Sequence, residues 1–169
     1  KTGIEGQEQI VRMAKGGDVL GYRALFAGET YSATSEVMED ASICFIDKNA
    51  LFPILKKDPQ TMMNVIRKLS TELRKAEDQM VGMVQKSAKE RLAELLLVLK
   101  EGYGKKDPKG SLLDIRLTRE EIADLIGTTQ ETAIRLLSEL NKEEIVLLRA
   151  REIVIRDAGA LADIAGMTN

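Results

Sequence analysis

Four side chains in the C-terminal half could read the edges of DNA base pairs. They lie in the stretch QETAIRLLSEL, which starts at residue 130. A helix here would turn its apolar residues inward, and these are Ala133, Leu136, Leu137 and Leu140. It would then expose Gln130, Glu131, Ile134 and Arg135. In a major groove, Arg can donate to guanine, Glu can accept from cytosine, Gln can pair with adenine and Ile can touch a thymine methyl. The same i to i+4 spacing of Glu131 and Arg135 also suits a surface ion pair.

The residues before this helix predict a sharp turn that would position it. Thr118 and Glu121 have the spacing of a capping box and start a first helix. Gly127 then permits a left-handed backbone, and Thr128 or Thr129 can cap the second helix. Two short helices joined in this way have the spacing of a helix-turn-helix, although an ordinary helical hairpin is the alternative.

The sequence after the second helix predicts a winged module. EIVLLRAREIVIRD, residues 144–157, contains two apolar strands around Arg149, Ala150 and Arg151. A hairpin with a basic tip would therefore lie beside the second helix. Upstream, KSAKERLAELLLVLK at residues 86–100 predicts a second, shorter helix that packs into a different core from that of the long helix before it. GYGKKDPKG, residues 102–110, is predicted to be a polar loop.

A long helix should start at Asp58-Pro59, because Asp is a good N-cap and Pro is tolerated at the first helical position. Its apolar positions alternate at spacings of three and four, which is a heptad stripe with Met62 as an extension. This seam consists of Ile66, Leu69, Leu73, Ala76, Met80 and Met83. The stripe predicts a parallel homodimer, and the alternative is that it packs on the N-terminal region. Glu72 and Glu77 flank the seam with like charges and do not help.

Residues 1–57 are predicted to be all-β. The segments EQIVRMA, SATSEV and SICFI are short and strand-like, and the turn residues GGD follow the first of them. Cys44 within SICFI is expected to be a buried small hydrophobe.

Composition narrows the function classes. The 169 residues include one Cys and no His, which excludes most zinc ligand sets and the Ser-His and Cys-His nucleophile pairs. No Walker loop, GxGxxG or GxSxG motif is present, so we expect no enzyme and see no cofactor site. No apolar run approaches the ~20 residues needed to cross a bilayer, so we expect a soluble, cytoplasmic protein without a membrane partner.

Three parts of the sequence together resemble the Crp/Fnr family of bacterial transcription regulators. They are GDVLGYRALFAGETYSATSEV, the long seam helix, and LTREEIADLIGTTQETAIRLLSEL followed by the hairpin. The resemblance implies an α+β protein with a cupin-like, cyclic-nucleotide-binding-like β-roll sensor at residues 1–57. A dimerisation helix at 58–86 and a winged helix-turn-helix DNA-binding domain at 87–169 would follow. Compared with the family, the chain starts inside the β-roll, so the roll is expected to be partial.

The resemblance also implies roles for individual residues. Glu131 and Arg135 look like the pair that reads a G·C in each half of an inverted repeat. Positions that typically hold DNA phosphates correspond to Thr118, Arg119, Thr129 and Thr132, and the wing would add Arg149 and Arg151. GYGKKDPKG occupies the place of a loop that touches RNA polymerase in relatives, which makes the polymerase a further candidate partner.

The sensor region departs from relatives that bind cyclic nucleotides. Those relatives carry G-E-L and a later R-S, whereas this chain has Gly21-Tyr22-Arg23 and Tyr31-Ser32. The remaining effector pocket is weak, and we expect an effector other than a cyclic nucleotide.

Charge keeps a second function open. Residues 100–169 contain 11 Lys and Arg against 13 Asp and Glu, which gives 11 − 13 = −2. Non-specific affinity for DNA should therefore be weak unless the charges segregate by face. The alternative is a winged-helix module that binds a protein or ligand without direct DNA readout.

Overall fold

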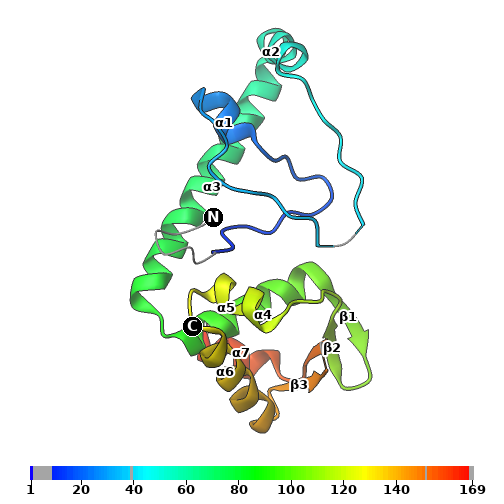
Figure 1. The fold of residues 1–169 in the computed structure, drawn as a ribbon, viewed down its shortest axis with the longest axis vertical. Helices are drawn as coiled ribbons and strands as arrows, with labels where there is room; N and C mark the ends of the chain where they lie inside the picture. Colours follow the sequence, from blue (N-terminus) through cyan, green and yellow to red (C-terminus); the bar gives the residue numbers. More distant parts are fainter. Residues whose placement is uncertain (2–8, 39, 151, 168–169) are drawn as a thin grey trace. The chain divides into compact units, whose positions relative to one another are not determined.

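The computed structural model describes residues 1, 9–38, 40–150 and 152–167. These residues form two compact units. The first contains Arg12–Met80, and the second contains Val81–Asn169 together with the described residues 9–11. The long helix α3 passes from the first unit into the second (Figure 1).

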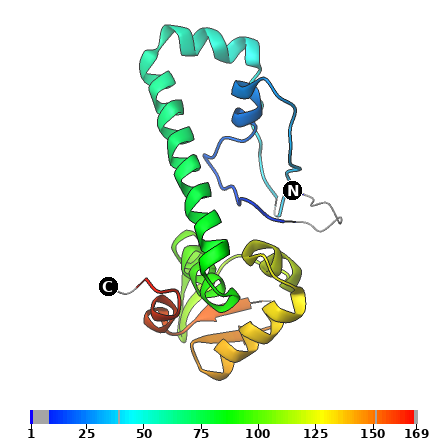
Figure 2. The same ribbon diagram turned by 90° about the vertical axis from the view of Figure 1, so that its left-hand side faces the viewer.

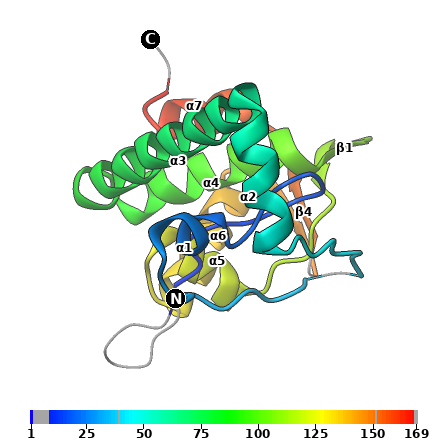
Figure 3. The same ribbon diagram turned by 90° about the horizontal axis from the view of Figure 1, so that it is seen from above.

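The first unit is helical in its described part. It contains α1 (Tyr22–Ala27), α2 (Lys48–Lys57) and most of α3 (Pro59–Gln85). Phe26 of α1 and Phe52 of α2 form an edge-to-face ring contact with centroids 6.1 Å apart. Figure 2 shows the sharp bend between α2 and α3, and Figure 3 shows the same bend from above.

The strands predicted at EQIVRMA, SATSEV and SICFI are not formed in the described residues. Residues 9–38 and 40–58 contain no strand but include α1 and α2, so the prediction that this region is all-β is wrong for the part that the structure describes. A strand needs a neighbour that accepts and donates its backbone hydrogen bonds, and no described segment of this unit supplies one. The apolar side chains of this stretch consequently remain exposed, as Phe45 at 85% and Ile43 at 75% illustrate. Cys44 is exposed as well, so the prediction that it is buried is wrong.

Helix α3 begins where the Asp58-Pro59 pair predicts. The Asp58 carboxylate accepts a hydrogen bond from the Thr61 hydroxyl and another, of 3.0 Å, from the backbone N of Gln60. These bonds lower the pKa of Asp58, and the bond from the Thr61 hydroxyl is the largest cause. No residue of α3 is buried, so its stability does not come from a covered apolar face within this chain.

The second unit packs helices against a small sheet. Helix α4 (Ala88–Tyr103) starts with a capping box between Ser87 and Glu90. The antiparallel strands β1 (Gly104–Asp107) and β2 (Gly110–Leu113) follow it. The prediction of a polar loop at residues 102–110 is therefore wrong. Its turn residues lie at the tip of a hairpin, where Asp107 pairs with Gly110.

The rest of the second unit has the predicted order. It consists of α5 (Arg119–Ile126), α6 (Gln130–Lys142), β3 (Val146–Arg149), β4 (Glu152–Ile155) and a further helix, α7 (Ala158–Ile164). The sheet order is β1-β2-β4-β3, with antiparallel neighbours. Ten large side chains are fully buried, and they are Leu92, Leu96, Ile122, Ile126, Leu137, Leu140, Val146, Val154, Ile155 and Leu161. All ten belong to this unit, so α5, α6 and the β3–β4 hairpin rest on one core.

Candidate nucleic-acid interface

The turn between α5 and α6 is built around Gly127. Its φ of 62° is left-handed, and its backbone N donates to the carbonyl of Ala123. The backbone N of Thr128 donates to the same carbonyl at 3.0 Å. Arg91 of α4 closes the end of α5 by donating to the carbonyl oxygens of Ile126 at 2.7 Å and Gly127 at 3.2 Å. The Arg91 contact had no signal in the sequence, because Arg91 and Ile126 are 35 residues apart.

Helix α6 has the two faces that the sequence predicts. Its N-cap is Thr129, whose hydroxyl accepts from the backbone N of Thr132 at 3.3 Å. The four inward residues Ala133, Leu136, Leu137 and Leu140 are all buried. The four candidate base-reading residues Gln130, Glu131, Ile134 and Arg135 are all exposed. Ile134 is a large apolar side chain that remains 44% exposed on the outer face of the helix.

Arg135 forms an ion pair on α6, but with a different partner from the one that spacing suggested. Its Nη1 lies 2.6 Å from the Oε1 of Glu139, one turn towards the C-terminus. Glu131 has no partner among the residues that the structure describes. Because the Arg135 side chain is 61% exposed, the pair with Glu139 is a surface pair worth about 0.3 to 0.5 kcal/mol. Such a pair can be exchanged for a stronger partner at low cost.

The candidate phosphate contacts begin at the N-termini of α5 and α6. Thr118 caps α5 and accepts from the backbone N of Glu121 at 3.1 Å, while Thr129 donates to the hydroxyl oxygen of Thr132 at 3.2 Å. A helix N-terminus favours an anion in general, although both of these first turns already carry carboxylates, Glu120 and Glu121 on α5 and Glu131 on α6. Arg119 is half-buried, its Nη1 is buried without a partner among the described residues, and desolvation lowers its pKa.

The wing is the hairpin formed by β3 and β4, and its Arg149 is already paired with a carboxylate. Arg149 donates to both carboxylate oxygens of Asp107, at 2.9 and 3.3 Å. That hydrogen bonding is the main reason why the pKa of Asp107 is lowered. A shallow pocket beside the pair is lined by Arg116, Arg149, Ala150 and Glu152. Arg151 lies outside the described residues.

Comparison with known proteins places this arrangement in a family. The family model of the Crp-like helix-turn-helix domain matches residues 90–164, which include α5, α6 and the wing. The family model of the cyclic nucleotide-binding domain matches residues 1–58. The chain belongs to the Crp/Fnr family. It is α+β, and the proteins that it resembles are regulators rather than enzymes.

Individual relatives agree with this assignment. The chain is 27% identical to the fumarate and nitrate reduction regulatory protein of Vibrio cholerae, over 97% of the chain and 65% of the relative. The same values hold for the protein of that name from Escherichia coli. A CooA mutant from Carboxydothermus hydrogenoformans is 30% identical with a TM-score of 0.62, covering 70% of this chain and 55% of CooA. FixK2 from Bradyrhizobium japonicum is 29% identical with a TM-score of 0.63, covering 70% and 59%. The chain thus spans 65% of the length of the curated relatives.

The apolar side chains of the heptad seam on α3 are largely exposed in the single chain. Ile66 is 48% exposed, Leu73 62% and Met80 63%; Ala76 is also exposed, and Leu69 is half-buried. Met83 differs, because its sulfur would lie 3.0 Å from a Cβ at Gly127, so it packs against the turn between α5 and α6.

The four residues of the candidate effector pocket make separate contacts in the structure. Arg23 donates from Nη2 to the hydroxyl of Ser32, and both side chains are exposed. Tyr22 instead accepts from Nη1 of Arg12 at 3.2 Å. Tyr31 is 75% exposed, and its ring lies against Gly21, where an added Cβ would come within 2.9 Å. The four residues therefore do not converge on one cavity.

No helix within the described ranges is long and apolar enough to cross a membrane.

Proposed function

We propose that this chain is a sequence-specific DNA-binding transcription regulator that acts as a homodimer on an inverted repeat in the cytoplasm. The observation that carries the proposal is α6, which buries four apolar residues and exposes Gln130, Glu131, Ile134 and Arg135. These exposed types match the donor, acceptor and methyl pattern of a major groove. Membership of the Crp/Fnr family supports the same assignment.

Base reading by Arg135 requires an exchange of partners. In the free protein its guanidinium is paired with Glu139. Guanine offers two acceptors in the plane of the guanidinium fork, whereas the exposed pair with Glu139 contributes little. Binding should therefore replace the pair with Glu139, and Glu131 is left to accept from the paired cytosine.

The homodimer is supported by the seam on α3. Three of its large apolar residues are about half exposed or more, and a second copy can cover them by heptad packing. A two-fold dimer of a helix-turn-helix protein places its recognition helices about 34 Å apart, which is one turn of DNA. The target is accordingly an inverted repeat. RNA polymerase is a further candidate partner, for which the β1–β2 hairpin is available.

We further propose that the effector of residues 1–58 is not a cyclic nucleotide. Glu and Arg, which hold the ribose and phosphate in relatives, are replaced by Tyr22 and by Tyr31. Arg23 is the only cation of the pocket motif, and it is an exposed side chain bonded to Ser32. Adding cyclic AMP should therefore leave DNA affinity unchanged, and an increase on addition would contradict this assignment.

The test is fluorescence anisotropy of a labelled inverted-repeat DNA. Arg135→Ala should weaken binding by about 1 to 3 kcal/mol, or about 5- to 150-fold in Kd. Replacing the paired G·C in the probe should cost a similar amount, and the two changes together should be less than additive. Arg74→Ala is the matched control, because Arg74 is an exposed arginine in an i to i+4 ion pair with Asp78 on α3.

The outcomes separate the two candidate functions. Equal losses for Arg74→Ala and Arg135→Ala would mean that only net charge matters and would remove base reading. Absence of binding to any inverted repeat would favour the alternative, a winged-helix module that recognises a protein or ligand. The net charge of −2 over residues 100–169 is the observation on which that alternative rests.

A further inference from the structure

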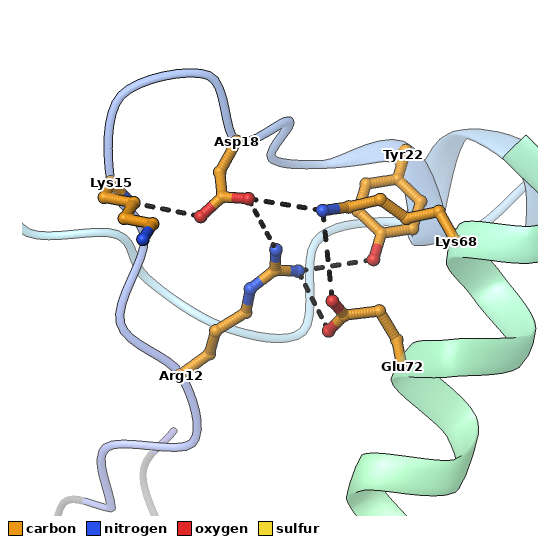
Figure 4. A network of polar contacts seen from close by, with 6 residues as sticks. All are labelled: Arg12, Lys15, Asp18, Tyr22, Lys68 and Glu72. Atoms are coloured by element: carbon orange, nitrogen blue, oxygen red, sulfur yellow. Dashed lines mark hydrogen bonds and ion pairs between the residues drawn. The ribbon is translucent and has the colours of Figure 1, made fainter. Parts of the chain in front are cut away.

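The segment of residues 12–22, here named the strap, is held on α3 by a network of ion pairs. Arg12 Nη1 lies 3.3 Å from the Glu72 carboxylate, and Lys68 Nζ lies 3.2 Å from Asp18. Arg12 also lies 3.8 Å from Asp18, and Lys68 lies 4.0 Å from Glu72. Tyr22 adds its hydroxyl to Arg12 (Figure 4). Two strap residues are thus paired with two α3 residues one turn apart.

Each strap charge has more than one source of stabilisation. The pKa of Asp18 is lowered, first by the backbone hydrogen bond from Lys15 and then by Lys68. Burial lowers the pKa of Arg12, but the bond to Tyr22 and the charge of Glu72 outweigh it and raise the value overall. The side chains of Arg12, Asp18 and Glu72 are each less than a third exposed, so salt screens these pairs less than fully exposed ones.

Glu72 occupies a special position relative to the seam. With Ile66, Leu73 and Met80 at a positions, Glu72 is a g position and Glu77 the following e position. In a parallel pair of helices, g of one heptad faces e of the next heptad of the other chain. Among the e and g positions from residue 65 to residue 84, only Glu72 and Glu77 are charged. The sole charged contact flanking the seam would therefore be a repulsion, formed twice in a two-fold dimer.

We propose that the strap controls dimerisation, because Arg12 neutralises Glu72 and so removes its repulsion from Glu77 of the partner subunit. The inference rests on the proposed homodimer. Glu77 itself is exposed and has no partner among the described residues, so Glu72 is the member of the pair that the chain can neutralise internally.

Lys68 alone does not replace Arg12. Lys68 precedes Glu72 by four residues, which is the weaker orientation for a helical ion pair, and it is closer to Asp18 than to Glu72. Glu72 has both cations while the strap is attached, and when the strap leaves α3 it loses Arg12 at 3.3 Å and keeps only Lys68, which lies at 4.0 Å. The sign of the effect is therefore fixed: strap attachment favours the dimer.

The coupling gives the N-terminal region a route to the DNA-binding form. Tyr22 belongs both to the network and to α1, next to Arg23. A ligand or modification that pulls the strap away would weaken the dimer, and by linkage dimer formation would hold the strap on α3 with the same free energy. An exposed charge pair shifts an equilibrium about two-fold, so two repulsions per dimer predict about a four-fold change in Kd.

The experiment measures the dimer dissociation constant by sedimentation equilibrium of the chain and its variants. Arg12→Gln should raise Kd about four-fold, whereas Arg12→Lys, which keeps the charge, should restore most of the affinity. Glu77→Gln should leave the dimer of the otherwise wild-type chain nearly unchanged, because Arg12 already neutralises Glu72 there, and it should cancel the effect of Arg12→Gln, although Arg12 and Glu77 share no contact within a chain. Lys15→Gln is the matched control, because its side chain is exposed on the same strap outside the ion pairs.

High salt should remove the differences between the variants, because the proposed effect is electrostatic. At about 1 M salt, where the screening length is about 3 Å, the variants should converge. If the dimer forms but Arg12→Gln behaves like Lys15→Gln, or its effect persists with Glu77→Gln, the strap inference is overturned and the homodimer stands. A wild-type chain that stays monomeric at all concentrations would overturn the homodimer and the inference with it.

Discussion

Replacing Gly127 by alanine should damage the turn between α5 and α6 in two separable ways. The left-handed φ of 62° costs any L side chain about 1 to 2 kcal/mol. The new Cβ would also lie 3.0 Å from the sulfur and 3.1 Å from the terminal methyl of Met83. Moving a packed methionine by a few tenths of an ångström adds about 1 kcal/mol. The total of about 2 to 3 kcal/mol should lower the Tm of this unit by about 10 to 20 °C.

Gly166 supplies the matched control for this prediction. It follows Ala165, the C-cap of α7, and has a φ of 67°, and a Cβ there would meet no atom within 4 Å. Gly166→Ala should therefore show only the backbone cost, about 1 to 2 kcal/mol. Met83→Ala should cost less in the Gly127→Ala background than in the wild type, because it then also removes a collision. Thermal melts followed by circular dichroism compare the wild type with the four variants, which are the three single substitutions and the double substitution of Gly127 and Met83. Equal effects of the two glycine changes, or strict additivity with Met83→Ala, would refute the packing argument.

Four further predictions concern single side chains. Thr118→Val should destabilise the second unit by about 1 kcal/mol in urea titrations, because α5 loses its capping oxygen. Asp107→Asn should destabilise this unit at pH 7, because the folded state stabilises the ionised carboxylate of Asp107 and thereby lowers its pKa. The difference in stability from the wild type should shrink as the pH falls below about 4, the pKa of an unperturbed Asp, and should vanish below the lowered pKa of the folded state. Leu73→Glu should leave the chain monomeric in sedimentation at concentrations where the wild type dimerises. Glu139→Gln should tighten DNA binding about two-fold at low salt in anisotropy, because Arg135 no longer has to leave a carboxylate.

Features that depend on neighbouring residues were predictable from the sequence. The starts of α5 and α6 are predicted by Thr118 with Glu121 and by Thr129. The capping bonds span only three residues, and both caps are formed. Gly127 announces the turn for the same reason, since its backbone conformation is a local property. The inner face of α6 follows from the helical period alone. The roles of its outer residues in reading DNA stay predictions.

Features that depend on distant residues were not predictable. SICFI has strand-like composition, but a strand also needs a neighbour, and composition does not report whether one is available. The β1–β2 hairpin was not predicted, because its residues are polar and turn-rich and lack the strand-like composition of SICFI. Asp107-Pro108 forms the turn between the two paired strands, but the whole segment was interpreted as a loop. Arg149 was assigned to phosphate from its charge, while its bond to Asp107 joins residues 42 positions apart. Helix α7 was missed because it has only 7 residues.

The pairing of arginines explains how a region with net charge −2 can be compatible with selective DNA binding. Arg135 is paired with Glu139 and Arg149 with Asp107 in the free protein. Under the proposed function, a random phosphate would have to displace a carboxylate from each arginine and would gain little, so we expect non-specific binding to be weak. A guanine that accepts both donors of Arg135, with its cytosine held by Glu131, gains directional bonds that a phosphate does not offer to both residues. Weak non-specific binding and retained base bonds together raise the ratio of specific to non-specific affinity. Under the proposed function, the salt dependence should therefore be shallow while discrimination against a changed G·C pair stays large, and a steep salt slope with little discrimination would mean that the arginines act only as charges.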